Sequence, residues 1–365
     1  MVENYKAEHS TSYKSVIKTT SLFGGVQLIQ IVLTMIRTKF VALYLGTTGV
    51  GFLSLLNTPL NLIASLSGFG INYSAVRDIS ESARNENINK ISRTIISFRR
   101  LVLFTGLIGT IVVVLMAERL SKWSFGDDSQ YWTFFILSLT LMINSISGGQ
   151  KALLQGLRKY RSMAKATAFG AFLGLLVSIP CYYFLRVKGI VPALVASSFI
   201  SLILSWYYAR KVSINRIRIT IFETLHEAKT LIKLGVIFSI SNQIGNLTKY
   251  LILTSISNKG GVDQVGLYSA GMSFMGTYVG LIFTAMSTDY YPRLAAINKD
   301  NNRIKTMVNQ QSIVSLLILF PIVIFLLWSM PIITRLFLSI RFIDIVPYVN
   351  LTVLGVILKA LSYCI

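Results

Sequence analysis

Charge in general, and acidic residues in particular, are scarce in this sequence. Of its 365 residues 13% are charged, and 14 Asp and Glu stand against 35 Lys and Arg, which gives a formal net charge of +21. A soluble domain usually carries about 25% charged residues. Because 53% of the chain is hydrophobic, this shortage argues against a soluble fold and indicates that lipid forms part of the solvent.

Cysteine, histidine and the short motifs of catalysis are also rare or absent. Cys181 and Cys364 lie in apolar stretches and are interpreted as packing residues rather than a disulfide framework. His9 and His226 lie in polar stretches and are interpreted as solvated. The patterns GxxxxGK[ST], HExxH, CxxC and GxSxG do not occur, so the sequence predicts no ATP-binding loop, no metal site, no cofactor and no enzyme activity.

Asp127 and Asp128 form an adjacent acidic pair in the stretch FGDDSQ. Such a pair can hold a metal ion or a sugar nucleotide. Gly and Asp are also strong turn formers, and we expect a turn outside the membrane here.

The excess of positive charge does not indicate nucleic-acid binding. The cations lie in short clusters between apolar blocks, as in the cytoplasmic loops of membrane proteins. A spanning helix needs about 20 apolar residues, and this length predicts an all-α polytopic membrane protein with about ten spans. The predicted spans are 15–45, 49–72, 95–117, 131–155, 164–185, 189–209, 229–256, 264–288, 308–329 and 345–365.

The distribution of cations predicts the orientation of the chain. Residues 1–14 are polar, and the first apolar block is long enough to span and has no small-residue cleavage site. With the N-terminus in the cytoplasm, roughly two thirds of the Lys and Arg residues fall in cytoplasmic segments. The outer loops are then short, with the longest at Ala117–Gln130, so no extramembrane domain is expected.

The chain reads as two related lobes. We predict an N-terminal six-helix lobe at 1–210, a cytoplasmic amphipathic connector at 211–228, and a C-terminal lobe at 229–365. Lys18 precedes Gly51 by the same number of residues as Lys233 precedes Gly266, which indicates a parallel internal repeat. Because the second lobe shows about four spans where a full repeat needs six, we expect the last hairpin to be missing or truncated.

Arg37 and Lys39 interrupt the apolar run IVLTMIRTKFVALYLGTTGVGF. A charge inside the bilayer costs at least about 2.5–3.5 kcal/mol on insertion scales, so it usually faces protein or a water-filled cavity. The side chains either extend to the outer headgroups or line a cationic cavity for an anionic cargo, and the arginine fork suits phosphate.

A second polar group lies in SNQIGNLTKYLILTSIS. Asn242, Asn246 and Lys249 share one helix face by their spacing. Such a face is expected to look toward the centre of a bundle, where it serves either as a substrate contact or as helix–helix packing. Asn57, two residues before Pro59, predicts a kink with a polar neighbour.

Three stretches resemble bacterial O-antigen and polysaccharide-unit flippases of the multidrug/oligosaccharidyl-lipid/polysaccharide exporter superfamily. They are Ile36–Ser80, Gly148–Thr167, which resembles the inner loop between the fourth and fifth helices, and Ser287–Ile297, which resembles the loop after the eighth helix. Related flippases for a lipid-linked peptidoglycan precursor carry a cavity arginine nine residues before a glycine turn. Arg37 stands nine residues before Gly46, so the resemblance implies that Arg37 lines the cavity.

The resemblance implies two pseudo-symmetric lobes around a central cavity in the bacterial cytoplasmic (inner) membrane. The expected activity is alternating-access transport of an undecaprenyl-diphosphate-linked oligosaccharide, for lipopolysaccharide or another polysaccharide, from the inner to the outer leaflet. Its direction would come from a proton or sodium gradient or from downstream consumption. The expected partners are this lipid-linked oligosaccharide, membrane lipid, a polysaccharide polymerase and a chain-length regulator, but no nucleic acid. The predicted substrate-binding residues are Arg37, Lys39, Lys249, Asn57, Asn242 and Asn246.

Two other functions remain open from the residues. A drug or cation exporter of the same superfamily would need carboxylates inside the spans, and these are almost absent. A membrane polysaccharide polymerase or glycosyltransferase would need a sizeable outer loop or acidic catalytic residues at a membrane face.

Overall fold

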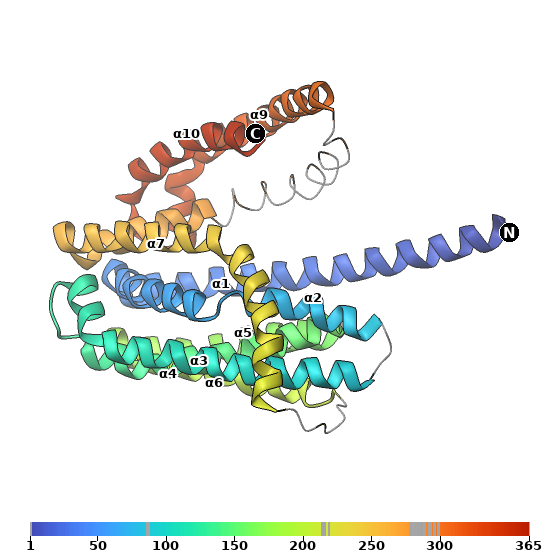
Figure 1. Ribbon diagram of the computed structural model, residues 1–365. Helices are drawn as coiled ribbons and strands as arrows, with labels where there is room; N and C mark the ends of the chain where they lie inside the picture. The colour runs from blue at the N-terminus through green and yellow to red at the C-terminus, as the bar shows by residue number, and fades with distance from the viewer. Residues whose placement is uncertain are drawn as a thin grey trace. The chain divides into compact units, whose positions relative to one another are not determined.

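The fold is helical throughout the described residues (Figure 1). The computed structural model describes the backbone of residues 2–84, 88–212, 217, 220–276 and 300–364, with isolated positions between 277 and 299. Side chains are described from residue 25 onward, with gaps at 84–88 and 90, within 213–241, within 277–299 and from 363 on. Much of the predicted 211–228 connector, the end of the predicted 264–288 span and the side chains of His9, His226 and Cys364 therefore lie outside the described residues.

The helices follow the predicted apolar blocks. They are α1 (Val2–Ser67), α2 (Ile71–Arg84), α3 (Ile88–Phe125), α4 (Tyr131–Gly156), α5 (Tyr160–Leu185), η1 (Arg186–Gly189), α6 (Ile190–Ala209), α7 (Ile221–Phe274), α9 (Asn301–Phe337), η3 (Ile340–Phe342) and α10 (Ile345–Cys364). Six described stretches are long and apolar enough to cross a membrane: Gly25–Ser67, Ile91–Phe125, Tyr131–Gly156, Tyr160–Ala209, Asn301–Phe337 and Ile345–Ser362. The all-α, multi-pass membrane fold is confirmed, and the number of spans stays a prediction.

Large apolar side chains on the outside of these helices agree with a lipid surrounding. Leu115 and Phe184 are each 77% exposed, and Trp328 is 74% exposed. A soluble monomer rarely exposes contiguous apolar surface on this scale. We infer that these side chains contact acyl chains rather than water.

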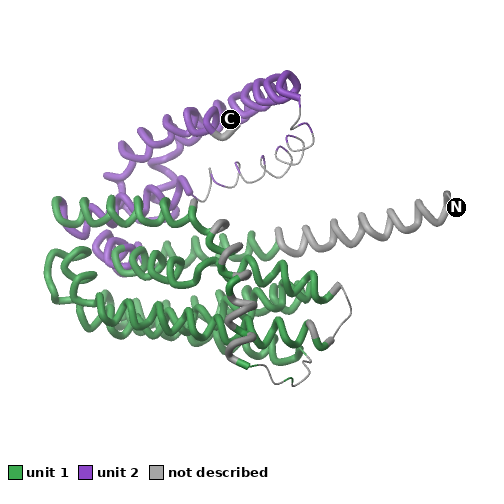
Figure 2. Tube along the Cα trace, viewed as in Figure 1, with its two compact units in different colours: residues 1–40, 55–259 green, residues 41–54, 260–365 purple. Residues whose placement is uncertain are grey.

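The described residues fall into two compact units (Figure 2). Unit 1 comprises residues 1–40 and 55–259, and unit 2 comprises residues 41–54 and 260–365. These units are not the predicted lobes, because the short segment 41–54 of α1 belongs with the C-terminal helices. The division into lobes at the 211–228 connector stays a prediction.

Unit 1 is built around α3, α4, α5 and α6, in which α3 packs on α4, α4 on α6 and α5 on α6. Small residues allow these helices to approach closely: a Cβ on Gly149 would lie 2.9 Å from Val102, and a Cβ on Gly174 would lie 3.4 Å from Ser197. A cluster of buried side chains joins α2, α3, α4 and the end of α6, and its members are Ala75, Ile79, Ile95, Phe98, Val102, Ala152, Leu153 and Ala209.

Helix α2 is an amphipathic element that the span pattern did not predict. Ile71, Ala75 and Ile79 are buried, whereas Tyr73 and Arg77 are exposed. This four-residue spacing gives one apolar face, which packs on α3 and α4. Asp78 on α2 is half-buried, and burial raises the pKa of its carboxyl above the ordinary value of 3.8.

In unit 2, α10 packs on α9. Asp300 caps α9, since its carboxylate accepts hydrogen bonds from the backbone N–H groups of Asn302 and Arg303, both at 3.1 Å. A carboxylate at this position satisfies donors that the first turn of a helix leaves open. A Cβ on Gly271 would lie 2.8 Å from Val349, so the end of α7 packs closely on α10.

The predicted turn at the acidic pair is confirmed. Asp127 accepts a hydrogen bond from the backbone N–H of Ser129 at 3.1 Å, and Gly126 has a positive φ of 86°, so the acidic pair lies in a turn. Cys181 is a free, half-buried cysteine. Among the described residues, no group of three or more His, Cys, Asp or Glu side chains is arranged to hold a metal ion.

Candidate functional site

Arg37 is the predicted site residue with the most defined surroundings. It lies on α1, is half-buried, and its Nη2 donates a hydrogen bond to the Tyr182 hydroxyl at 3.1 Å. Tyr182, on α5, is completely buried. The guanidinium is therefore directed toward the helices of unit 1.

The geometry leaves Arg37 able to bind an anion. A guanidinium has five N–H donors and no acceptor, and the Tyr182 hydroxyl occupies one side of this fork. The remaining donors can reach a second acceptor group, and a phosphate or diphosphate matches their planar arrangement. Tyr182 fixes the direction of the guanidinium without neutralising its charge.

Lys39 and Asn57 are half-buried on α1, and their binding role stays a prediction. Residues two apart on a helix do not face each other, so Lys39 points to a different side of α1 from Arg37. Asn57 lies beyond Gly46, where the helical dihedral angles of α1 are interrupted. The break in α1 lies at Gly46, while Pro59 sits within the helix.

The polar residues of α7 lie on two sides of the helix, one packed against other helices and one exposed. Gln243 accepts a hydrogen bond from Ser65 at 2.8 Å. One and two heptads further along, the Tyr250 hydroxyl lies 3.2 Å from that of Ser124, and Ser257 donates to the Ser124 carbonyl at 2.7 Å. These contacts hold α7 against α1 and the end of α3.

The predicted substrate contacts on α7 lie outside this packed side. Asn242 and Lys249 are exposed, and Asn246 is half-buried. Their exposure leaves the two amides and the ammonium available for a ligand, and their binding role stays a prediction.

The structure also contains a symmetric contact around the glycines of the internal repeat, within unit 2. A Cβ on Gly51 would lie 2.0 Å from the Val262 carbonyl oxygen, and a Cβ on Gly266 would lie 2.0 Å from the Thr47 carbonyl oxygen. Thr47 precedes Gly51 as Val262 precedes Gly266. The two equivalent segments therefore pack backbone to backbone across a local two-fold relation.

The repeat extends to the backbone break in each helix. Gly46 has φ 67° and ψ −161°, and Gly261 has φ 79° and ψ 175°. This region of conformational space is essentially restricted to glycine. Each long helix thus consists of two segments joined at an equivalent glycine, and the shared pattern GTTGVGFLS and GVDQVGLYS was the signal that could have located both breaks.

Asp263 links the two segments of this contact. Its Oδ1 accepts hydrogen bonds from the hydroxyls of Thr47 at 2.7 Å and Thr48 at 2.6 Å. The bonds from Thr48 and Thr47 lower the pKa of Asp263 below its ordinary value of 3.8. The span pattern did not single out this carboxylate, because it lies between two predicted spans.

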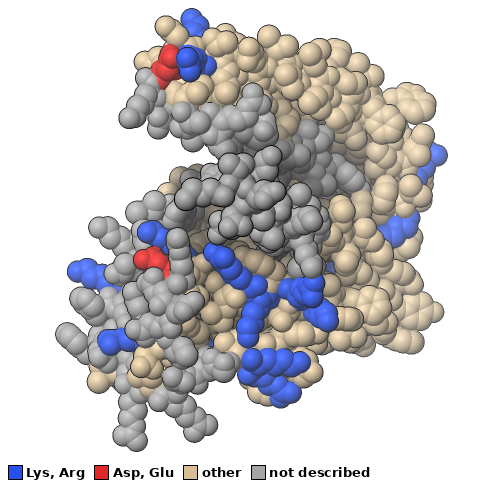
Figure 3. Space-filling model, turned by 90° about the vertical axis from the view of Figure 1, so that its right-hand side faces the viewer, with Lys and Arg blue, Asp and Glu red and all other residues tan. Residues whose placement is uncertain are grey.

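Exposed cations gather at one end of unit 1. This end contains the start of α3, the α4–α5 turn and the end of α6, and its exposed cations include Arg99, Arg100, Arg158, Lys159, Arg161, Lys165, Arg210 and Lys211. Figure 3 shows a group of Lys and Arg side chains close together on one face. These are the segments in which the sequence predicts cytoplasmic charge.

Comparisons with known proteins agree with this fold. The sequence model of the family described as polysaccharide biosynthesis protein matches residues 45–347. A Shigella flexneri protein named "Putative O-antigen transporter" is 25% identical over 320 residues, which cover 85% of this chain and 73% of that protein. These matches confirm the resemblance to polysaccharide-unit flippases.

Solved structures of transporters share the fold. An inward-facing multidrug resistance MATE family transporter of the MOP superfamily matches with a TM-score of 0.72 and 16% identity, over 92% of this chain and 79% of that one. A MOP superfamily transporter from Pyrococcus furiosus, described as having a binding pocket of reverse polarity, matches with a TM-score of 0.60 and 15% identity, over 95% and 82%. At these identities the likeness shows a MATE-like fold.

Proposed function

Because the chain belongs to the polysaccharide biosynthesis protein family, we propose that it is a flippase for a lipid-linked oligosaccharide. The cargo is an undecaprenyl-diphosphate-linked O-antigen or other polysaccharide repeat unit. The protein moves it from the inner to the outer leaflet of the bacterial cytoplasmic membrane by alternating access. The N-terminus and the cation-rich end of unit 1 face the cytoplasm in this proposal.

The observation that carries the proposal is the position of Arg37. A guanidinium inside an apolar span is costly, and this one is held toward the helices of unit 1 by a buried tyrosine. A diphosphate is the part of the cargo that is common to all repeat units, and it is the group that the arginine fork recognises. Lys39, Lys249, Asn57, Asn242 and Asn246 supply further contacts to the diphosphate or the sugars.

The distribution of carboxylates supports this cargo over a cationic drug. Across the six described spans the single carboxylate is Glu118, and it pairs with Lys122 one turn away near the end of α3. A cationic drug needs a negative partner in the membrane interior, where unpaired charge is expensive. An anionic lipid-linked sugar needs cations instead, and Arg37 and Lys39 are such cations.

The chain acts in this proposal as a transporter and not as an enzyme. Direction comes from a proton or sodium gradient or from consumption of the cargo on the outer side. A polysaccharide polymerase and a chain-length regulator are the partners that receive the cargo. The relatives named above are transporters, which supports this interpretation over a polymerase or glycosyltransferase.

Replacement of Arg37 tests the proposal in a strain whose surface polysaccharide depends on this protein. We expect Arg37→Ala to lower surface polysaccharide at least ten-fold and to leave lipid-linked repeat units in the inner leaflet. Arg119→Ala, which removes an exposed cation from the far part of α3, serves as the matched control and should behave as wild type. Normal surface polymer from an Arg37→Ala protein present in the membrane at wild-type amount would overturn the assignment.

Tyr182→Phe refines the same experiment. It removes the hydroxyl that orients Arg37 and keeps the charge, and a hydrogen bond to a charged group contributes about 1.5–3 kcal/mol. We expect a partial loss of surface polysaccharide, smaller than that of Arg37→Ala. A Tyr182→Phe effect as large as that of Arg37→Ala would assign the role to the tyrosine instead.

A further inference from the structure

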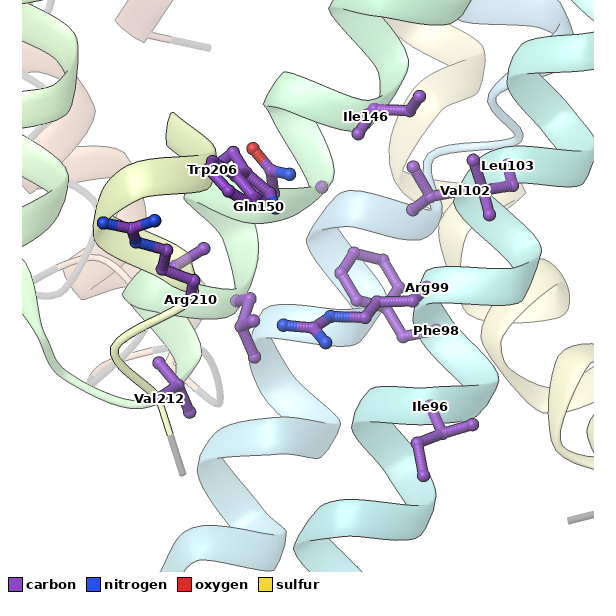
Figure 4. A pocket seen from close by; sticks show the side chains of 13 residues that line it. Ile96, Phe98, Arg99, Val102, Leu103, Ile146, Gln150, Trp206, Arg210 and Val212 are labelled. Carbon is purple, nitrogen blue, oxygen red and sulfur yellow. The ribbon is translucent and has the colours of Figure 1, made fainter. Parts of the chain in front are cut away.

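Unit 1 contains a cavity that no predicted site residue lines. Its volume is about 560 Å³, and α3, α4, α6 and the residues that follow α6 form its walls. In Figure 4 the Arg99 side chain extends from α3 into the space, and Arg210 lies across it, on the same side as Trp206 and Gln150. The volume is within the range of small-molecule binding sites.

The rim of this cavity is cationic. Among its described lining residues, Arg99 and Arg210 are the two that carry charge, and none is acidic. The Arg210 guanidinium lies 5.0 Å from the Trp206 ring centre and 4.9 Å from that of Tyr207. Such stacking orients a guanidinium and keeps its positive charge. Within the described residues, neither arginine forms an ion pair with a carboxylate.

The floor of the cavity is apolar and well packed. Phe98, Val102, Leu153 and Ala209 are each at most 5% exposed and belong to the buried cluster that joins α2, α3, α4 and α6. Close packing of this kind holds the walls in place. The cavity therefore has a fixed apolar base beneath two exposed arginines.

The cavity opens on the outer surface of the helices. Trp206 is 52% exposed and Leu103 is 45% exposed, and both line the cavity. Tryptophan at the end of a spanning helix is typical of the membrane–water interface. A ligand that reaches this place from the membrane brings acyl chains that lie along the apolar surface.

We propose that this cavity binds the phosphate headgroup of an anionic phospholipid. The arginines bind the phosphate, Gln150 offers a hydrogen-bonding amide to the rest of the headgroup, and the acyl chains cover Leu103 and its apolar neighbours. Basic pockets between spanning helices on the cytoplasmic side are suited to anionic headgroups. The assignment to the inner leaflet rests on the proposed orientation, whereas the binding itself does not depend on the flippase function.

The test compares lipid binding by the purified full-length protein and its variants. Native mass spectrometry measures the binding of phosphatidylglycerol and of zwitterionic phosphatidylcholine. We expect Arg99→Gln with Arg210→Gln to weaken phosphatidylglycerol binding at least ten-fold. The matched control, Arg161→Gln with Lys165→Gln, removes the same charge from exposed positions at the same end of unit 1 and should leave binding unchanged.

Equal loss in both double variants would overturn the proposal, because it would indicate attraction to surface charge in general. Equal binding of the two lipids by wild type would also overturn it. Loss of phosphatidylglycerol binding in the presence of millimolar inorganic phosphate would overturn it as well. So would binding of a polyprenyl diphosphate at this cavity by a protein that does not bind phosphatidylglycerol.

A second measurement uses the wild-type protein, so it does not depend on folding of the variants. A phosphatidylglycerol with a photoreactive headgroup should label peptides of α3 and α6 that contain Arg99 or Arg210. Labelling confined to other helices would contradict the proposal.

Discussion

The two long helices that carry the internal repeat have the same backbone and different side chains. Gly46 in α1 and Gly261 in α7 adopt the same conformation, and Gly51 and Gly266 make reciprocal contacts. Nine residues before its glycine, however, the first copy has Arg37 and the second has Ile252. The two copies share backbone conformation and backbone contacts, and they differ in whether they carry a charged side chain.

This difference separates two kinds of residue in the same helices. The glycines determine how the helix segments join and pack, so their replacement should affect folding. Arg37 and its surroundings provide charge, so their replacement should affect transport without affecting folding. The predictions below test that separation.

The largest effect is expected at the reciprocal contact. A methyl group on Gly51 or Gly266 would lie 2.0 Å from a backbone carbonyl oxygen, and backbone cannot rotate away as a side chain can. We expect Gly51→Ala and Gly266→Ala each to destabilise the protein by about 3 kcal/mol or more, seen as a lower melting temperature and less protein in the membrane. Gly245→Ala, at a position with no atom within 4 Å, is the control. If either variant at the contact kept the wild-type melting temperature, the two segments could move apart to accept a methyl group, and the close contact would not be needed for stability.

The two helix breaks should respond equally to a smaller change. Gly46 and Gly261 have positive φ values of 67° and 79°, and an alanine in this region costs about 1–3 kcal/mol. We expect similar losses in melting temperature for Gly46→Ala and Gly261→Ala. Helical Gly245→Ala should instead be neutral or slightly stabilising, since alanine favours helix. If the melting temperature fell for one variant and not for the other, the two breaks would not be structurally equivalent.

Moving the charge between the copies tests the chemical side of the comparison. Ile252 is 38% exposed, so an arginine fits at this position. We expect Ile252→Arg not to rescue Arg37→Ala, with surface polysaccharide remaining about ten-fold below wild type, a difference of about 1.4 kcal/mol. Arg37→Lys in the same strain should retain partial activity. Rescue by Ile252→Arg would mean that either copy can supply the cation.

The smallest effect is expected at Asp263, which occupies in the second copy the position that Thr48 has in the first. The hydrogen bonds from Thr48 and Thr47 lower its folded-state pKa below 3.8, so its contribution to stability is present above pH 3.8 and is lost as the pH falls through the folded-state pKa. We expect the melting temperature of wild type to fall more between pH 6 and pH 3 than that of Asp263→Asn. Asp344→Asn, at an exposed aspartate of the same unit, is the control. An identical pH dependence of the melting temperature for wild type and Asp263→Asn would show that the ionised Asp263 carboxylate does not stabilise the fold.

Much of the fold follows from the sequence because a helix that crosses a membrane needs an apolar stretch as long as the membrane core is thick. The apolar blocks coincide with α1, α3 to α7, α9 and α10. Helix α2 was not predicted because it is short and its apolar residues occupy one face. The position of segment 41–54 in unit 2 depends on packing between residues far apart in the chain, which periodicity does not report.

The candidate site was predictable in part. Arg37 was conspicuous as a charge within an apolar run, but its partner was not, since the sequence Tyr182-Tyr183-Phe184 does not reveal which ring points inward. Spacing placed Asn242, Asn246 and Lys249 on one face of α7, while the contacts of Gln243 and Tyr250 show which face is packed. Arg99 and Arg210 are distant in sequence, and only the fold brings them to one cavity.

The Gly51–Gly266 contact has an evolutionary consequence. It is made by main-chain atoms, which are the same in every protein, so substitutions at the two glycines cannot adjust its strength by degrees. Variation that preserves the main-chain contact is therefore expected at the bordering side chains, Thr47, Thr48 and Asp263. A library randomised at these three codons would vary the hydrogen bonds that link the two segments while the main-chain contact stays the same.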